Sequence, residues 1–315
     1  MCGIVAAVAG RNIVPVLLEG LRKLEYRGYD SAGLALINGD GLQRLRSVGR
    51  VAELTAQADS SQVAGLTGIA HTRWATHGVP SERNAHPHIS AGLAVVHNGI
   101  IENHEALRTR LKAAGYEFTS DTDTEVVAHL IAHELKTAPD FLTAVRQALA
   151  QLQGAYALAV LREADPSRVV VAREGSPLLL GLTDDGCYAA SDASALLQVT
   201  RRIVYLENGD CAELMRDSYR IARVDGTPVA RAESESQLSA DAVELGQYRH
   251  YMQKEIFEQP VALANTLEML GTAHSIQPGL FGASSEEVLR DVKQVLIIAC
   301  GTSYHAGLVA RYWLE

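Results

Sequence analysis

The hydrophobic pattern of the chain predicts short buried strands separated by amphipathic helices. Residues 3–9 form an unbroken apolar run of strand length, which is typical of a buried strand. Residues 13–25 instead carry leucines three or four positions apart with charged residues between them, the spacing of one buried helix face. The same reasoning predicts strands at 34–37, 66–70, 92–97, 154–161, 168–173, 177–182, 187–190 and 202–206, and helices at 104–114, 140–152 and 193–199.

The order of these elements favours an α+β fold over a strict βαβ repeat. Strands dominate residues 154–230, and two long helices precede them. A polar stretch of small residues at 232–245 predicts a linker. Residues 248–270 then carry a second helical pattern, which Pro260 interrupts.

The end of the chain has the pattern of an α/β domain that has only begun. A predicted strand at 295–299 leads through a Gly-Thr-Ser turn into the start of a helix. Backbone N–H groups and hydroxyls at such a turn can bind phosphate, so Thr302 and Ser303 are candidate phosphate ligands, although a plain βα turn has the same pattern. So short a segment cannot fold as an independent domain. The expected organisation is a first domain at 1–231, a linker and helical segment at 232–285, and a truncated start of a second domain at 286–315.

Composition and charge are those of a globular protein and argue against several classes of partner. Hydrophobic residues make up 47% of the chain and charged residues 21%, enough for a sizeable core. The formal net charge of −9 argues against a nucleic-acid groove and against binding to an anionic membrane surface. No apolar run is long enough to span a bilayer, and no secretory leader pattern opens the chain.

The cysteines and histidines predict neither a disulfide framework nor a metal site. The four cysteines lie far apart and form no CxxC pair. His71, His77, His86 and His88 fit no familiar ligand spacing and have no carboxylate pair nearby. We therefore expect no metal, no cofactor and a cytoplasmic protein with reduced thiols.

Cys2 directly follows the initiator methionine, and this position gives it distinctive chemistry. Removal of Met1 would leave a thiol and a free α-amine on one residue. Such an amine has a pKa of roughly 7.7–8.0, so it can act as the base for its own thiol near neutral pH. An ordinary buried cysteine at the start of a strand explains the same residue, so the rest of the chain has to decide.

Residues 71–78 concentrate hydrogen-bonding groups and are too polar for a core strand. Arg73 has the planar fork that matches a carboxylate, and Thr76 and His77 can donate or accept hydrogen bonds beside it. A chance polar loop would have the same composition.

Two other stretches suit the binding of charge. Asn98 and Gly99 follow a buried strand, where they form either a tight turn or the donors of an oxyanion hole. Asp123 belongs to a capping-box pattern that runs from Thr122 to Glu125. Its carboxylate can therefore serve the helix start or bind the ammonium group of a ligand.

Taken together, these stretches resemble the class II glutamine amidotransferase family. The resemblance rests on residues 2–5, 26–31, 71–78, 84–87, 97–103 and 122–125. Residues 248–256 and 299–303 resemble, more narrowly, the isomerizing glutamine–fructose-6-phosphate aminotransferases, or glucosamine-6-phosphate synthases.

The resemblance implies an α+β N-terminal-nucleophile (Ntn) fold. It would be a four-layer αββα sandwich, followed by a linker and an incomplete α/β segment of a sugar isomerase (SIS) domain. Cys2 would be the nucleophile with its α-amine as base, and Asn98 and Gly99 would form the oxyanion hole. The remaining implied roles are Arg73 for the glutamine carboxylate, Asp123 for its ammonium group, Thr76 and His77 as pocket wall, Trp74 as gate of the ammonia path, and Arg27 as a residue that orders the site for coupling.

The implied reaction is hydrolysis of L-glutamine, with the ammonia passing in a complete enzyme to fructose 6-phosphate. The SIS domains that bind this sugar are missing beyond their opening strand and turn, so we expect at most a glutaminase from this chain. A homodimer is expected only of the full enzyme.

Other functions stay open. Another class II amidotransferase would begin in the same way, but residues 248–303 contain no phosphoribosyl-diphosphate or ATP-pyrophosphatase loop. A second alternative is a non-catalytic fragment or binding module that needs the isomerase half. A purely structural protein is the third, and it leaves the cluster at 73–77 unexplained.

Overall fold

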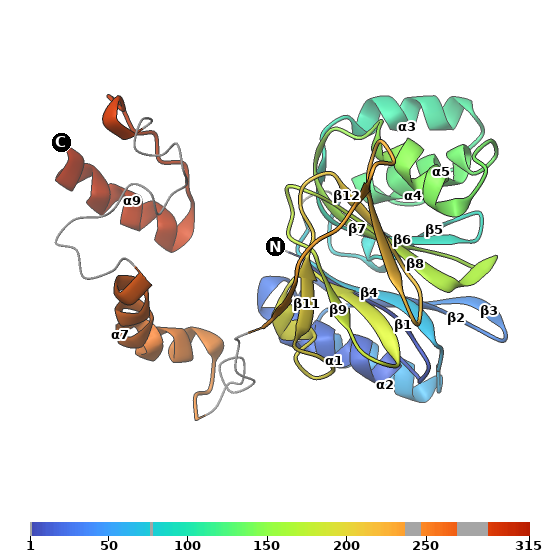
Figure 1. Cartoon of the computed structure of the whole chain (residues 1–315), viewed down its shortest axis with the longest axis horizontal. Helices are drawn as coiled ribbons and strands as arrows, with labels where there is room; N and C mark the ends of the chain where they lie inside the picture. Colours follow the sequence, from blue (N-terminus) through green and yellow to red (C-terminus); the bar gives the residue numbers. More distant parts are fainter. Residues whose placement is uncertain (1, 76–77, 237–246, 270–288) are drawn as a thin grey trace. The chain divides into compact units, whose positions relative to one another are not determined.

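A computed structural model describes residues 2–75, 78–236, 247–269 and 289–315 of the chain (Figure 1). The chain divides into two compact units, Met1–Gly246 and Gln247–Glu315. Within the described residues, no helix combines the length and the apolar character needed to cross a membrane.

The first unit contains an eight-stranded antiparallel sheet with β1 near its middle. The strand order is β15-β11-β9-β10-β1-β4-β2-β3. The strands are β1 (Gly3–Ala9), β2 (Ser31–Asn38), β3 (Gly41–Val48), β4 (Thr67–Arg73), β9 (Leu179–Leu182), β10 (Gly186–Ala190), β11 (Arg202–Tyr205) and β15 (Glu233–Glu235).

A second, seven-stranded antiparallel sheet has the order β14-β13-β12-β8-β7-β6-β5. Its strands are β5 (His88–Ser90), β6 (Leu93–Ile101), β7 (Gly154–Arg162), β8 (Asp165–Glu174), β12 (Asp210–Leu214), β13 (Tyr219–Arg223) and β14 (Pro228–Val229).

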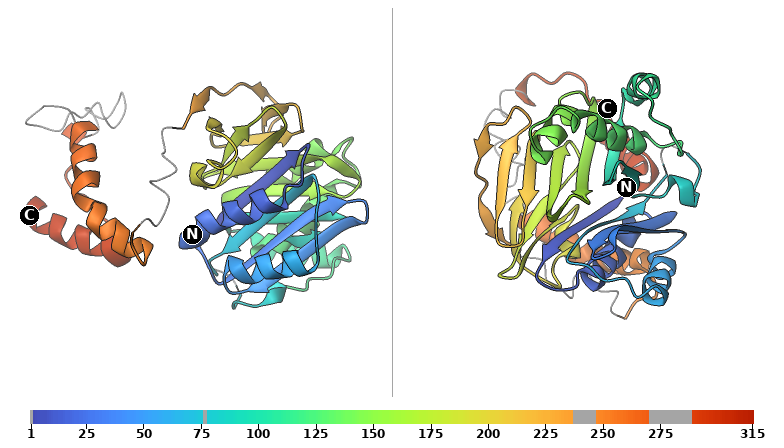
Figure 2. Two further views of the ribbon diagram at one scale, coloured as in Figure 1. Left: turned by 90° about the horizontal axis from the view of Figure 1, so that it is seen from below. Right: turned by 90° about the vertical axis from the view of Figure 1, so that its right-hand side faces the viewer.

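Helices cover the outer face of each sheet and complete four layers (Figures 1 and 2). The first sheet carries α1 (Val14–Leu24) and α2 (Val51–Ser60), and the second carries α3 (His104–Ala113), α4 (Asp123–Glu134) and α5 (Phe141–Leu149). Three short 3₁₀ turns connect elements: η1 (Glu25–Arg27), η2 (Glu82–Asn84) and η3 (Ala193–Ala195).

The position of β1 in the sandwich explains why its sequence is apolar throughout. Alternate residues of a strand face opposite sides of the sheet. Val5 and Ala7 pack beneath the helices, whereas Ile4, Ala6 and Val8 pack against the second sheet. A strand buried on both faces needs no polar positions. The expected αββα sandwich is confirmed.

Two strands extend through residues that the sequence pattern assigned to a loop or turn. β4 continues through His71, Thr72 and Arg73, all at most 3% exposed. β6 continues through Asn98 and Gly99. The expectation that these polar residues leave the core was wrong. The side chains of His71, Arg73 and Asn98 hydrogen-bond to protein groups instead of meeting solvent.

Sheet pairing also continues beyond residue 231. β15 lies in the range expected to be a linker and pairs with β11, although all three of its residues are exposed. An edge strand of this kind is held by backbone hydrogen bonds and needs no apolar residue, so hydrophobicity gave no signal for it.

The described residues of the second unit include the helices α7 (Tyr251–Met269) and α9 (Gly301–Leu314). α7 runs across Pro260 without a break in the helix. The strand expected at 295–299 is not formed, and these residues are exposed. A strand is stabilised by pairing with a neighbour, and the described residues of this unit supply none.

Candidate active site

Cys2 lies at the start of β1, beside the end of β4. The antiparallel pairing sets Gly3 opposite Thr72, so the next residues along, Cys2 and Arg73, fall at the same end of the sheet. The backbone N–H of Trp74 donates to Cys2 Sγ at 3.2 Å, and the thiol lies 3.6 Å from the Trp74 carbonyl oxygen.

The surroundings of the thiol keep it protonated at rest. Burial raises the pKa of the Cys2 thiol, and the nearby Asp30 carboxylate adds to this rise. The Trp74 N–H and the Arg73 guanidinium oppose it without reversing it. Since the thiolate is the nucleophilic form, a base has to take the proton when Cys2 attacks.

Asn98 and Gly99 reach Cys2 from the second sheet, on β6. The Asn98 side-chain amide donates from Nδ2 to the Cys2 carbonyl oxygen at 3.1 Å. Gly99 has a φ of +132°, and a Cβ there would lie 2.8 Å from the Ala155 carbonyl carbon and overlap its oxygen. Only glycine therefore fits at this position of β6.

One small cavity joins five of the eleven residues that the sequence selected as site candidates. Gly99 and Cys2 share it with Arg73, Trp74 and Asp123. The other lining residues are His86, His97, Thr122 and Thr124. Residues more than a hundred positions apart in the sequence thus surround a single thiol.

Arg73 is held by a backbone carbonyl group and an acidic side chain, both from residues outside the strands. Its Nη2 donates to the Gly78 carbonyl oxygen at 3.0 Å, and its Nη1 lies 3.9 Å from Asp30 Oδ1. Asp30 also accepts a hydrogen bond from the Ala75 N–H. Asp30 therefore anchors the segment after β4, a role that the sequence did not suggest even though the residue stands in a resembling motif.

Asp123 begins α4 but does not act as part of a capping box. Its Oδ2 accepts from the Ile101 N–H at 2.9 Å and lies 3.8 Å from His97 Nδ1. The Thr122 side chain makes no cap hydrogen bond, and Glu125 accepts from Thr119 and Ser120 instead. The capping-box expectation was therefore wrong, because the Thr122 hydroxyl pairs elsewhere, with His88 and Ser120.

Trp74 lines the cavity, whereas Arg27 lies outside its lining. Trp74 is half exposed and meets Tyr29 edge to face, with ring centroids 5.8 Å apart. Arg27 does not line the cavity; its Nη1 donates to Asp192 at 3.2 Å and to the Ser191 carbonyl oxygen at 3.4 Å. Ser191 in turn accepts from the Ile4 N–H, which connects Arg27 with β1.

Four buried histidines surround the back of the site: His71, His86, His88 and His97. The rings of His71 and His86 have centroids 4.2 Å apart. Burial lowers the pKa of His71 to about 3, and it lowers the pKa values of His86 and His88 well below their ordinary range. The imidazoles of His71, His86 and His88 are therefore neutral. Among the residues whose positions are described, no three His, Cys, Asp or Glu side chains are arranged to hold a metal ion.

Four of the site residues that the sequence predicted are not placed at the cavity beside Cys2. Thr76 and His77 lie outside the described residues. Thr302 and Ser303 lie in the first turn of α9, in the second unit, where both are exposed.

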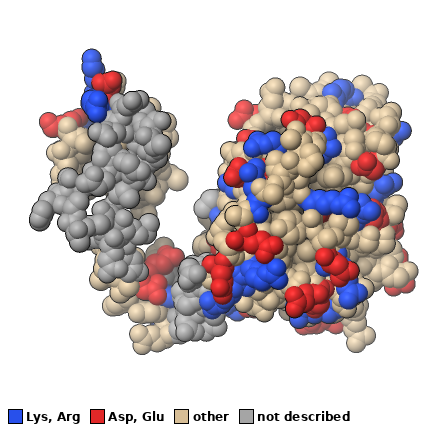
Figure 3. Space-filling view, in the orientation of Figure 1, with Lys and Arg blue, Asp and Glu red and all other residues tan. Residues whose placement is uncertain are grey.

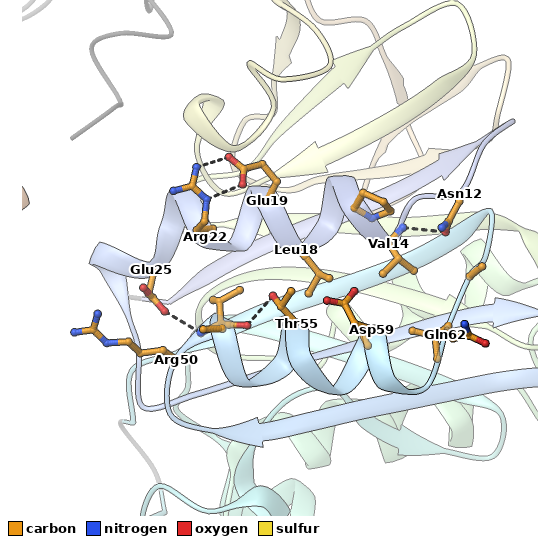
Figure 4. A pocket seen from close by; sticks show the side chains of 16 residues that line it. Asn12, Val14, Leu18, Glu19, Arg22, Glu25, Arg50, Thr55, Asp59 and Gln62 are labelled. Carbon is orange, nitrogen blue, oxygen red and sulfur yellow. Dashed lines mark hydrogen bonds and ion pairs between the residues drawn. The ribbon is translucent and has the colours of Figure 1, made fainter. Parts of the chain in front are cut away.

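A larger hollow of about 950 Å³ lies on the outside of the first unit, between α1 and α2 (Figure 4). Its charged groups are largely occupied, since Arg22 binds Glu19 and Glu25 accepts from the Val51 N–H. It shares no residue with the cavity at Cys2 and contains no nucleophilic thiol.

Comparison with known proteins agrees with this geometry. A family model described as glutamine amidotransferase domain matches residues 71–198. The isomerizing glutamine–fructose-6-phosphate aminotransferases of Vibrio cholerae and Shewanella oneidensis are 57% and 56% identical to the chain over its whole length. The whole chain is therefore similar to the aminotransferases of this family. It spans about half the length of these curated relatives, 52% of each.

Solved structures place the fold of this chain among the Ntn amidotransferases. The glutamine phosphoribosylpyrophosphate amidotransferase of Bacillus subtilis matches with a TM-score of 0.57 and 26% identity, over 75% of this chain and 50% of that one. A structure described as the allosteric regulatory enzyme of purine biosynthesis matches equally well, with a TM-score of 0.57 and 27% identity, over the same shares of the two chains.

Proposed function

We propose that this chain hydrolyses L-glutamine to glutamate and ammonia, with Cys2 as the nucleophile. The observation that carries the proposal is the single cavity that Cys2 shares with Arg73, Gly99 and Asp123. An amino-acid amide needs a nucleophile, a cation and an anion around it, and Cys2, Arg73 and Asp123 supply them. It also needs a backbone donor near the nucleophile, and Gly99, with its positive φ, can supply that.

Glutamine binds through its α-carbon groups in this proposal. The Arg73 guanidinium pairs with the α-carboxylate, and the Asp123 carboxylate accepts from the α-ammonium group. Thr76 and His77 complete the wall of the pocket. Trp74 gates the path by which ammonia leaves, and Arg27 orders the site for coupling.

The reaction requires that Met1 is removed, because only then does Cys2 carry a free α-amine. This amine takes the thiol proton as sulfur attacks the side-chain amide carbon. Asn98 and Gly99 donate hydrogen bonds to the oxyanion that forms. The proton then passes to the amide nitrogen, ammonia leaves, and water hydrolyses the glutamyl thioester, which releases glutamate and restores the thiol.

The relatives are named for amino transfer from glutamine to fructose 6-phosphate, with isomerization. We infer that the ammonia formed here serves that transfer when the SIS part of a longer protein is present, and that Thr302 and Ser303 then contribute to binding the sugar phosphate. A homodimer is proposed for that longer protein alone. All four cysteines are free thiols, which supports a cytoplasmic location. On the face in Figure 3, acidic and basic side chains are interspersed over the first unit, which fits a small-molecule substrate better than a nucleic acid.

The test is glutamate release by the purified chain beside Cys2→Ala, with the N-terminal mass read on the same sample. Cys300→Ala is the matched control, since it removes an exposed thiol of the second unit. The proposal expects release by the wild type and by Cys300→Ala, none by Cys2→Ala, and a mass without Met1. A processed wild type that releases no glutamate would overturn it and leave a non-catalytic module.

A further inference from the structure

His71 is a buried residue next to the active site. The proposed reaction does not use it. It lies on β4, is fully buried, and pairs with Ile4 across the sheet. Ile69, two residues earlier, packs between the two sheets. Because alternate residues of a strand share a face, His71 also points from the first sheet toward β6 of the second.

The contacts of His71 determine which of its nitrogens carries a proton. Nε2 lies 2.9 Å from the His97 carbonyl oxygen and 3.1 Å from Asn98 Oδ1. Both of these atoms are acceptors, so Nε2 has to be the donor. Nδ1 has no hydrogen-bond partner among the described residues, and the ring is neutral because its burial disfavours charge. One proton is thus present, and it sits on Nε2.

The other end of the Asn98 amide fits the same orientation. Nδ2 donates to the Cys2 carbonyl oxygen at 3.1 Å while Oδ1 accepts from His71. A flipped amide would set Oδ1 against the Cys2 carbonyl oxygen and an NH₂ group against the Nε2–H of His71. Both ends would then face a group of the same kind, and neither hydrogen bond could form.

We propose that His71 is a positioning residue, whose Nε2–H holds the Asn98 amide with its NH₂ group turned toward Cys2. One N–H of that group binds the Cys2 backbone, and the second is left to donate to the oxyanion. This inference rests on the proposed glutaminase function. It assigns to His71 no contact with the substrate and no transfer of a proton.

Three substitutions separate positioning from packing. His71→Gln keeps an N–H near the place of Nε2, His71→Asn moves the donor toward the place of Nδ1, and His71→Phe fills the site without a donor. We expect kcat for glutamine hydrolysis to fall by about 10- to 100-fold in His71→Phe and His71→Asn, less than the loss of a whole oxyanion-hole donor. His71→Gln should recover to within about threefold of wild type, because it restores the hydrogen bond.

The other kinetic readouts should stay near wild type. KM should change by no more than about threefold, since Arg73 and Asp123 are untouched. Alkylation of Cys2 by iodoacetamide passes through no oxyanion, so its rate should change by less than about twofold. In an Asn98→Ala background, His71→Phe should lose almost nothing more, because the two residues act as one unit. Equal kcat losses for His71→Gln and His71→Phe, or additive losses in the double variant, would overturn the inference.

A measurement without turnover guards against variants that do not fold. The ¹⁵N shifts of the imidazoles in the full wild-type chain report the tautomer of each histidine. The inference requires the Nε2–H form for His71, and an Nδ1–H form overturns it whatever the activity. If the tautomer is Nε2–H but the wild type releases no glutamate, the proposed function fails, and the positioning role of His71 in that reaction fails with it.

Discussion

Replacing Gly99 by alanine should destabilise the second sheet and abolish glutamine hydrolysis. Gly99 combines a φ of +132° with backbone atoms so close that a Cβ would lie 2.8 Å from the Ala155 carbonyl carbon and 3.0 Å from Tyr156 Cα. The obstructing atoms belong to the backbone of the paired strand β7, so no side chain can rotate away. β6 and β7 would have to move apart.

The expected magnitude follows from two separate effects. A side chain in this backbone region costs about 1–3 kcal/mol, and forcing extra volume into a packed site costs about 1–3 kcal/mol more. The free energy of unfolding should therefore fall by about 2–6 kcal/mol. At about 2–4 °C per kcal/mol, this lowers Tm by roughly 4–24 °C. The Gly99 N–H would also leave its place beside Cys2, which should lower kcat at least about 100-fold.

Two other glycines separate the effects. Gly39→Ala meets nothing within 4 Å and lacks a positive φ, so its Tm should match wild type. Gly115→Ala also meets nothing but has a φ of +90°, so it reports backbone strain alone. Thermal unfolding by circular dichroism and glutamate release would be measured for all three. If Gly99→Ala is as stable as Gly39→Ala, the reasoning from the β6–β7 geometry is refuted.

Three further predictions address the charged and titrating groups. Arg73→Lys should raise KM for glutamine by about 10- to 100-fold with a smaller change in kcat, because a single ammonium group replaces the bidentate guanidinium fork. Steady-state kinetics tests this, and an unchanged KM would contradict it. Asp30→Asn should lower the pKa of the Cys2 thiol, since the Asp30 carboxylate raises it. The pH profile of iodoacetamide alkylation should therefore move to lower pH. A move of the profile to higher pH would contradict the assignment. Acid should destabilise the fold. The pKa of His71, lowered by burial to about 3, and that of His88, also lowered by burial, lie below the ordinary value of 6.5. The unfolded chain therefore binds more protons below about pH 6.5. His71 alone should remove about 2 kcal/mol of stability between pH 7 and pH 5, and His88 should act in the same direction. Urea unfolding at the two pH values measures this, and equal free energies would refute it.

The sequence predicted the apolar elements well because their periodicity records burial directly. β1 and α1 were expected within one residue of their observed ends. The ends of β4 and β6 were missed because His71 and Asn98 are polar and yet buried, and composition cannot tell that each will find a partner on the facing sheet. Pairing across the sandwich is a tertiary property.

The candidate site was predicted by resemblance and not by periodicity. The motifs selected Cys2, Arg73 and Asp123, and these line one cavity. Asp30 and His71 stood in the same motifs but received no role, because their function depends on what they contact. The expected strand at 295–299 illustrates the opposite error, in which a strong local preference is not realised without a neighbouring strand to pair with.

The central claim is that Cys2, as the mature N-terminus, is the nucleophile that attacks glutamine. The most direct test incubates the full chain with a glutamine analogue whose side-chain amide is replaced by a diazoketone, followed by digestion and peptide mass spectrometry. The account predicts one adduct, on Cys2 of a peptide without Met1, and protection by excess glutamine. An adduct on Cys187, Cys211 or Cys300 in place of Cys2, or no adduct in a chain that releases glutamate, would contradict it.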